Sequence, residues 1–244
     1  MGFLDKLFGK KDRKSEKSCS VVVVAAGSSA RMDGIDKILT PLGGEALLLH
    51  ALIPFQSSDM VSEIVIVTRE DKLVQIGNLC SRKGLDKVKR IVQGGETRTE
   101  SVWAGIKAVS ASAGFVAIHD GARPFITQKI IEDTIRTAMT RSAAAPAVPV
   151  KDTIKRAEDG VVTETLDRSA LFAMQTPQIF AAPLIRVGIQ KAVEEKLALT
   201  DDCAAVERLG CPVALTEGSE ENIKITTRFD LILGEAILAA RNGY

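Results

Sequence analysis

The sequence predicts an α/β protein in which helices cover a mostly parallel β-sheet. Its 244 residues are 45% hydrophobic, which is enough for a substantial core. Aromatic residues make up only 4%, while aliphatic residues are abundant. Short β-branched runs also alternate with helical patterns along the chain, as expected of β-α units. These observations disfavour an all-β sandwich.

The alternation is regular up to about residue 140. We expect strands at residues 21–25, 64–68, 88–92 and 115–119. Helical patterns follow these strands at residues 47–56, 71–82, 97–109 and 127–140. This order predicts right-handed β-α-β crossovers and therefore parallel neighbours in the sheet.

The rhythm breaks after a further apolar run at residues 144–150. Residues 151 to 168 are polar and β-prone around Asp159-Gly160, which predicts a hairpin arm at about 151–170 that projects from the body. Later patterns predict helices at 183–195 and 201–209, a strand at 213–216 and a final helix at 228–241. We expect one domain over residues 19–244.

Residues 1–18 differ from the rest of the chain. Phe3, Leu4, Leu7 and Phe8 recur at helical spacing and precede a charged run. We expect a mobile extension; the alternative is an amphipathic helix that makes weak contact with a membrane surface or a partner.

Charge and cysteine content narrow the functional classes. Lys and Arg number 32 against 31 Asp and Glu, so no overall field favours nucleic acid as a partner. The four cysteines form no C-x-x-C pair, which argues against structural zinc. The sequence has no signal-peptide pattern and no apolar run of transmembrane length, so we expect a cytoplasmic protein.

The loop after the first expected strand carries the first functional signal. Ala25, Ala26 and Gly27 open a run of small residues whose backbone N–H groups can approach an anion closely. Arg31 and Lys37 add positive charge. The loop matches neither the P-loop nor the dinucleotide-binding pattern, and by itself it indicates only an anion-binding turn.

Two later segments favour a ligand site at the same edge of the sheet. Asp120 and Arg123 follow the fourth expected strand, at the carboxyl edge where open parallel sheets bind ligands. Asp120 is a candidate magnesium ligand, because magnesium beside phosphates takes one or two carboxylates. Gly95 and Glu96 follow the third strand and lead into a helix that carries Ser101.

A scattered polar set completes the motifs. Each member alone would be an ordinary cap or surface residue. The members are Thr153, Arg168, Thr176, Thr200 and Lys224.

Taken in order, these motifs resemble those of the 2-C-methyl-D-erythritol 4-phosphate cytidylyltransferase family of the non-mevalonate isoprenoid pathway. The resemblance covers about residues 20 to 241. The matching motifs are Ala-Ala-Gly-x-x-x-Arg-Met with Lys37, Gly-Gly-Glu-x-Arg, His-Asp-x-Ala-Arg-Pro, Asp-Thr-Ile-Lys, Asp-Arg, Gln-Thr-Pro-Gln, Thr-Asp-Asp and Glu-Asn-Ile-Lys-Ile-Thr.

The resemblance implies a Rossmann-like, glycosyltransferase-A-type nucleotidyltransferase fold, dependence on Mg²⁺ or another divalent cation, and a homodimer with exchanged arms. It implies transfer of CMP from CTP to a small sugar-alcohol phosphate, 2-C-methyl-D-erythritol 4-phosphate. By motif, Arg31, Lys37 and Lys224 resemble the residues that stabilise the reacting phosphates. The implied nucleotide contacts are Ala25, Ala26, Gly27, Gly95, Glu96, Ser101 and Asp120, the last also at the metal position. The implied acceptor contacts are Arg123, Thr153, Arg168, Thr176 and Thr200, with Arg168 supplied by the partner subunit.

Two positions depart from the family pattern, which commonly has glycine at Ser29 and glutamine at Ile38. Two alternative functions stay open. A ribitol-5-phosphate cytidylyltransferase would share the fold and reaction, but such relatives tend to carry Leu-Ala-Gly-Gly in the first loop and to lack the arm motifs. The second alternative is a non-catalytic nucleotide-binding regulator. Such a protein would not need five charged site residues, so their joint presence argues against it; they are Arg31, Lys37, Asp120, Arg168 and Lys224.

Overall fold

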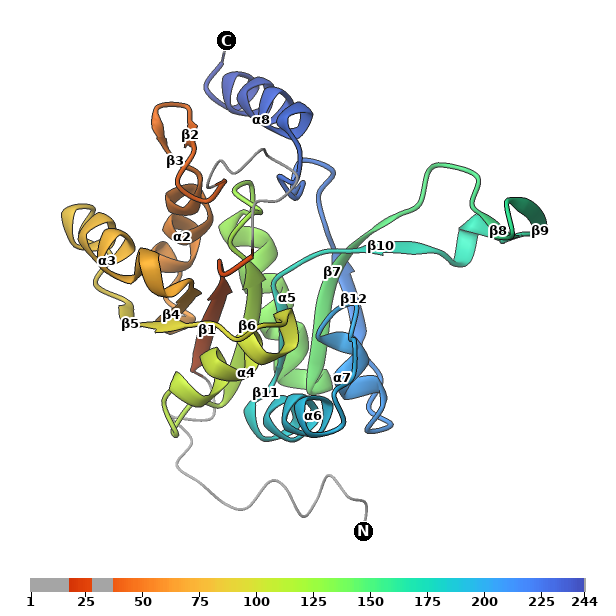
Figure 1. Cartoon of the computed structure of the whole chain (residues 1–244), viewed down its shortest axis with the longest axis horizontal. Helices are drawn as coiled ribbons and strands as arrows, with labels where there is room; N and C mark the ends of the chain where they lie inside the picture. Colours follow the sequence, from red (N-terminus) through yellow and green to blue (C-terminus); the bar gives the residue numbers. More distant parts are fainter. Residues whose placement is uncertain (1–17, 28–36, 244) are drawn as a thin grey trace.

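The computed structural model describes residues 18–27 and 37–243 and has three layers, with a central sheet between two groups of helices (Figure 1). The main sheet contains eight strands. Six of them run parallel: β1 (Cys19–Val24), β4 (Val61–Thr68), β5 (Val88–Gln93), β6 (Phe115–Asp120), β7 (Ala143–Pro149) and β12 (Ala214–Glu217). The predicted α/β class with a mostly parallel sheet is confirmed.

Two strands of the sheet are antiparallel and were not predicted. β10 (Phe172–Met174) pairs with β7, and β11 (Gln178–Ala181) lies between β6 and β7. β11 was missed because it is only four residues long and its apolar residues run directly into the apolar start of the next helix, so no boundary marks the strand. A small hairpin of β2 (Pro41–Leu42) and β3 (Glu45–Ala46) was also missed.

Alternate residues of β1 face the two helical layers, as a strand's period of two requires. Val21 and Val23 face a core shared with α2 (Leu47–Ser57), α3 (Leu73–Arg82) and α5 (Gln128–Arg141). Val22 faces a second core formed with α4 (Arg98–Ala108), α6 (Ala182–Glu194) and α7 (Cys203–Glu207). β1 is therefore buried on both faces, which explains its unbroken run of valines.

The predicted helices agree with the structure to within one or two residues at most ends. The segment predicted at 71–82 divides into a 3₁₀ turn, η3 (Glu70–Lys72), and α3. The final helix, α8 (Arg228–Arg241), begins and ends where the sequence predicted. It packs near β2 over a small apolar cluster that includes Leu42 and Phe125.

The predicted hairpin is present and extends away from the sheet (Figure 1). It consists of β8 (Lys155–Glu158) and β9 (Val161–Thr165), with Asp159 and Gly160 at positive φ in the turn. A second 3₁₀ turn, η4 (Arg168–Ala170), leads back to β10. Within the described residues, no helix has the length and apolar character needed to cross a bilayer. The extension expected at residues 1–18 lies outside the described part of the chain, apart from Ser18.

Candidate active site

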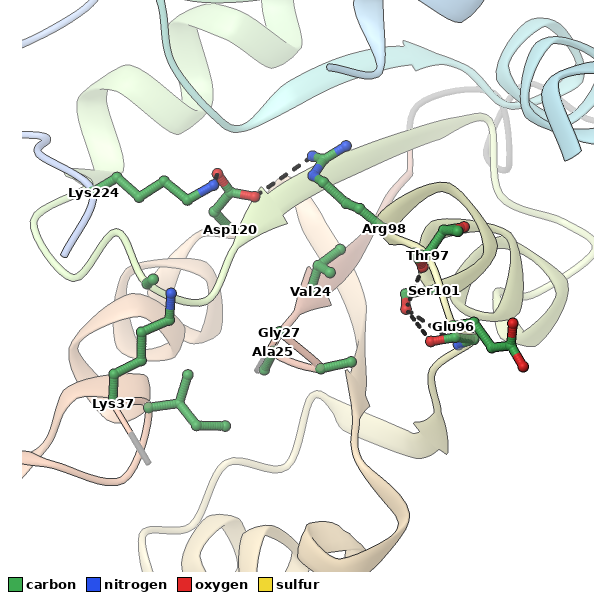
Figure 2. A pocket seen from close by; sticks show the side chains of 14 residues that line it. Val24, Ala25, Gly27, Lys37, Glu96, Thr97, Arg98, Ser101, Asp120 and Lys224 are labelled. Atoms are coloured by element: carbon green, nitrogen blue, oxygen red, sulfur yellow. Dashed lines mark hydrogen bonds and ion pairs between the residues drawn. The ribbon is translucent and has the colours of Figure 1, made fainter. Parts of the chain in front are cut away.

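A cavity of about 420 Å³ lies at the carboxyl ends of β1 and β6 (Figure 2). It is therefore at the edge where open parallel sheets place their ligands. Its walls are formed by the small-residue loop, by the start of α4, and by Asp120 and Lys224, whose side chains are in contact at the carboxyl end of β6. The lining residues are Val24, Ala25, Ala26, Gly27, Lys37, Ile38, Gly95, Glu96, Thr97, Arg98, Ser101, Asp120, Ala122 and Lys224.

The small-residue loop packs closely on the loop before α4. Ala25 N–H donates to the Val67 carbonyl at 2.7 Å, which fixes the start of the first loop on β4. A Cβ added to Gly94 would lie 2.7 Å from both the Ala26 Cβ and the Ser101 Oγ. Glycine at this position therefore allows the two loops to approach and form one wall of the cavity.

The start of α4 is fixed by a capping box. The Thr97 hydroxyl accepts from the Glu100 N–H at 3.1 Å, and the Glu100 carboxylate accepts from the Thr97 N–H at 2.8 Å. Ser101 Oγ donates to the Thr97 carbonyl at 2.9 Å and accepts from the Gly95 N–H at 3.2 Å. These bonds hold the Gly95–Ser101 segment in a defined shape.

Asp120 is a carboxylate surrounded by positively charged side chains. Its Oδ2 lies 2.7 Å from Lys224 Nζ and 3.8 Å from Arg123 Nε, and its Oδ1 lies 3.5 Å from Arg98 Nη2. Although burial opposes ionisation, these cations lower the pKa of Asp120 to about 2. The carboxylate is therefore charged throughout the neutral range, and three cations surround one anion.

A chain of hydrogen bonds supports Asp120 from behind. The antiparallel register pairs Gln178 with Ile118, so two residues further along Thr176 lies opposite Asp120. Thr176 Oγ1 accepts from the Asp120 N–H at 3.1 Å and lies 3.0 Å from His119 Nδ1. Burial lowers the pKa of His119 to about 4, so the ring is neutral at pH 7. Its Nε2 lies 3.2 Å from the Arg123 carbonyl, which can only accept, so Nδ1 accepts from Thr176.

Lys224 reaches Asp120 because its segment is tied to the loop after β6. Ile225 N–H donates to the Ala122 carbonyl at 2.8 Å. Arg123 Nη1 donates to the Asn222 carbonyl at 2.7 Å, on the other side of Lys224 in the chain. The Glu-Asn-Ile-Lys motif and the His-Asp motif are thus brought together by one backbone hydrogen bond and one bond from the Arg123 side chain to the backbone.

The structure brings most of the predicted site residues together. Nine of them line the cavity: Ala25, Ala26, Gly27, Lys37, Gly95, Glu96, Ser101, Asp120 and Lys224. Arg123 and the buried Thr176 lie behind Asp120 rather than on the cavity wall. Thr153 and Arg168 are exposed in or beside the arm, where Arg168 Nη1 donates to the Lys151 carbonyl, and Thr200 is exposed before α7. Arg31 and Ser29 lie outside the described residues.

Two residues near Asp120 were not predicted as part of the site. Arg98 lines the cavity and forms two hydrogen bonds with the buried Asp202. Both positions lie inside motifs found in the sequence, Gly-Gly-Glu-x-Arg and Thr-Asp-Asp, and their place in these motifs could have marked them as site residues. Only the fold shows that they meet. Ile38, where the family commonly has glutamine, is buried and gives the cavity an apolar lining residue.

The donor set at the cavity fits a magnesium ion that arrives with phosphates. Among the described residues, no three His, Cys, Asp or Glu side chains cluster closely enough to hold a metal ion. Magnesium beside phosphates needs only one or two carboxylates, because phosphate oxygens and waters supply its other ligands. Asp120 can supply one such carboxylate.

Comparisons with known proteins identify the family of the chain. The family model described as 2-C-methyl-D-erythritol 4-phosphate cytidylyltransferase matches residues 19–240. The chain is 48% identical to the protein of that name from Halalkalibacterium halodurans, covering 91% of this chain and 97% of the relative. It is 47% identical to the protein of the same name from Clostridium novyi, covering 91% of this chain and 96% of the relative.

Solved structures give the same result. The 4-diphosphocytidyl-2C-methyl-D-erythritol synthase from Anaerococcus prevotii superimposes with a TM-score of 0.82 at 31% identity, covering 91% of this chain and 96% of that one. The 2-C-methyl-D-erythritol 4-phosphate cytidylyltransferase from Thermus thermophilus gives a TM-score of 0.73 at 31% identity, covering 89% and 97%. The expected fold and family are thereby confirmed, and the chain belongs to the 2-C-methyl-D-erythritol 4-phosphate cytidylyltransferase family.

Proposed function

We propose that this protein transfers CMP from CTP to 2-C-methyl-D-erythritol 4-phosphate, giving 4-diphosphocytidyl-2-C-methyl-D-erythritol and pyrophosphate. The observation that carries the proposal is the position of Asp120 between Lys224 and Arg98, in a cavity that also contains Lys37 and the small-residue loop. A triphosphate and a phosphate monoester are both anions, and this cavity concentrates positive charge. The names of the relatives support the same reaction.

The reaction requires an oxygen of the acceptor phosphate to attack the α-phosphorus of CTP while pyrophosphate leaves. A phosphate monoester has its second pKa near ~6 and is largely dianionic at neutral pH, so the nucleophile needs no general base. This agrees with His119, which is neutral, buried and fully engaged behind Asp120. Catalysis then rests on positioning and charge stabilisation.

Three cations are proposed to act on the reacting phosphates. Lys37 and Lys224 enter the cavity from different segments (Figure 2). Arg31 is assigned to the same role from its motif alone. A Lys or Arg near the phosphates stabilises the negative charge that shifts onto the leaving pyrophosphate.

Asp120 is proposed to hold the divalent cation, which we take to be Mg²⁺. When bound, such an ion would neutralise part of the phosphate charge. Asp120 is suited to this role because its low pKa keeps it ionised. The nucleoside is assigned to the opposite wall, where Gly95, Glu96 and Ser101 face the first loop.

The acceptor side is proposed to be completed by a second copy of the chain. Thr153 and Arg168 belong to a projecting arm whose isolated two-stranded hairpin exposes Val161 and Val162. Such a hairpin is marginally stable alone, so pairing with a partner subunit would stabilise it. In a homodimer of this kind, Arg168 would reach the partner's cavity.

A pyrophosphate-release assay tests the proposed function. CTP would be supplied with either 2-C-methyl-D-erythritol 4-phosphate or ribitol 5-phosphate, at saturating Mg²⁺. Release with the first acceptor is expected; release only with ribitol 5-phosphate would assign the protein to the alternative acceptor. No release with either acceptor, together with retained CTP binding, would indicate a non-catalytic nucleotide-binding regulator.

A further inference from the structure

Arg98 is held by a second, buried carboxylate besides Asp120. Its Nη1 and Nη2 donate to Oδ1 and Oδ2 of Asp202 at 3.0 and 2.7 Å, and Asp202 is only 1% exposed. Two parallel bonds between a guanidinium and a carboxylate fix both the position and the plane of the arginine head group.

Asp202 is itself held by the central sheet. The Gln178 side-chain carbonyl accepts from the N–H groups of Asp202 and Cys203 at 2.9 and 3.1 Å, while its amide donates to Asp201 at 2.8 Å. Gln178 lies on β11, paired in register with Ile118 of β6. Asp202 and Asp120 are therefore both fixed relative to the same pair of strands.

Arg98 divides its charge between these two carboxylates. Its Nη2 is 2.7 Å from Asp202 but 3.5 Å from Asp120 Oδ1, and Lys224 occupies the other Asp120 oxygen at 2.7 Å. Figure 2 shows Lys224 and Arg98 on opposite sides of Asp120. If Asp202 lost its charge, Asp120 would become the nearest carboxylate to Arg98, and a closer pair would compete with a cation for Asp120.

We infer that Asp202 and Arg98 are positioning residues for Asp120. Asp202 holds Arg98 at a distance from which it orients the Asp120 carboxylate without forming a close ion pair with it. The carboxylate then stays accessible to the divalent cation that accompanies the nucleotide. This inference rests on the proposed function, because it concerns how Asp120 serves a metal–nucleotide complex.

The variant Asp202→Asn tests the inference, since it removes the charge and keeps the shape. The Mg²⁺ concentration that gives half-maximal CTP binding, measured by calorimetry, should rise by roughly 10-fold or more, as outer-shell partners of metal ligands commonly change affinity by about 10–100-fold. The KM for the acceptor should change less than this Mg²⁺ requirement. The double variant Arg98→Gln/Asp202→Asn should need less Mg²⁺ than Asp202→Asn, because the competing cation is gone. A purely structural role for Asp202 predicts no such recovery.

Glu63→Gln is the matched control. Glu63 is also buried, and it binds Ser110 N–H beyond the other end of α4 at 2.7 Å. This variant should lower stability without changing the Mg²⁺ requirement for CTP binding. The inference would be overturned if the Mg²⁺ requirement rose equally in Asp202→Asn and Glu63→Gln, or if it rose less than two-fold in Asp202→Asn.

A second variant decides the matter if Asp202→Asn does not fold. Arg98→Lys keeps the charge but lacks the two-pronged group that binds Asp202, so its Mg²⁺ requirement should also rise. A folded Arg98→Lys protein with the wild-type requirement would refute the positioning role. Failure of the wild-type protein to bind CTP at any Mg²⁺ concentration would instead refute the proposed function, and the inference with it.

Discussion

Lys224 Nζ lies 2.7 Å from Asp120 Oδ2, although one residue ends β6 and the other precedes the last helix of the chain. The pair joins the segment before α8 to the end of β6, and both residues line the cavity. Arg98 also faces this carboxylate, and the cavity is lined by three cations, Lys37, Arg98 and Lys224, against two carboxylates, Glu96 and Asp120. A site of this kind favours a polyphosphate accompanied by a cation.

Asp120→Asn should lower kcat/KM for CTP by roughly 10²-fold or more, the usual size of the loss when one preorganised electrostatic group is removed. The asparagine cannot carry the charge that attracts Mg²⁺, and it leaves three cations without their common partner. Pyrophosphate release and circular dichroism would separate lost activity from lost folding. Asp133→Asn, on the exposed face of α5, is the control. Normal kcat/KM in a folded Asp120→Asn protein would contradict the role of Asp120.

Lys37→Ala should depress kcat by about 10²–10³-fold, because it removes charge next to the reacting phosphates. The melting temperature should change little, since Lys37 is not part of the apolar core. Arg31→Ala is expected to behave in the same way. Lys107→Ala, whose exposed side chain lies over Trp103, controls for loss of a lysine. An unchanged kcat in either site variant would remove that residue from the mechanism.

Gly27→Ala and Gly94→Ala should separate ligand space from protein packing. A Cβ on Gly27 meets no described protein atom within 4 Å, so this variant should keep its stability and raise the KM for CTP if the nucleotide occupies that space. A Cβ on Gly94 would meet Ala26 and Ser101, so this variant should lose both stability and CTP affinity. Thermal unfolding and CTP titration give the two readouts. Equal stability losses in the two variants would show that the loops do not pack as described.

His119 predicts a loss of stability in mild acid. The unfolded chain takes up the histidine proton near its ordinary pKa of 6.5, whereas the folded protein does so only near 4. The unfolded state therefore binds more protons between these values, and the free energy of unfolding falls as the pH drops from 6.5 to 4. The full effect is about 3 kcal/mol. Denaturant titrations of wild-type and His119→Gln proteins across this range should show a shallower pH slope in the variant; parallel slopes would assign the loss to other groups.

The proposed dimer predicts complementation between two inactive variants. If Arg168 acts in the partner's site, a heterodimer of Lys37→Ala and Arg168→Ala subunits contains one intact site. Random reassociation of equal amounts should then restore about one quarter of the wild-type activity. The variants would be mixed under mild denaturation, returned to native buffer and assayed for pyrophosphate release. Activity no higher than that of the separate variants would show that Arg168 acts in its own subunit or not at all.

The sequence by itself determined the fold class, most of the helices and the family. Apolar runs such as Val21 to Val24 specify buried parallel strands, and the helical patterns specify the elements that cover them. The small-residue loop, Lys37, Asp120 and Lys224 were identified from motifs, and all of them line one cavity in the structure.

Tertiary structure decided which of these motifs meet. β11 is too short to be predicted from periodicity, yet it places Thr176 opposite Asp120 and Gln178 against the α7 segment. Arg98 was visible in a motif, but its pairing with Asp202 depends on the packing of two distant segments. Sequence patterns record local periodicity and chemical type. They do not record that Arg98 Nη2 lies 2.7 Å from Asp202 Oδ2 and 3.5 Å from Asp120 Oδ1, because these distances depend on how distant segments pack.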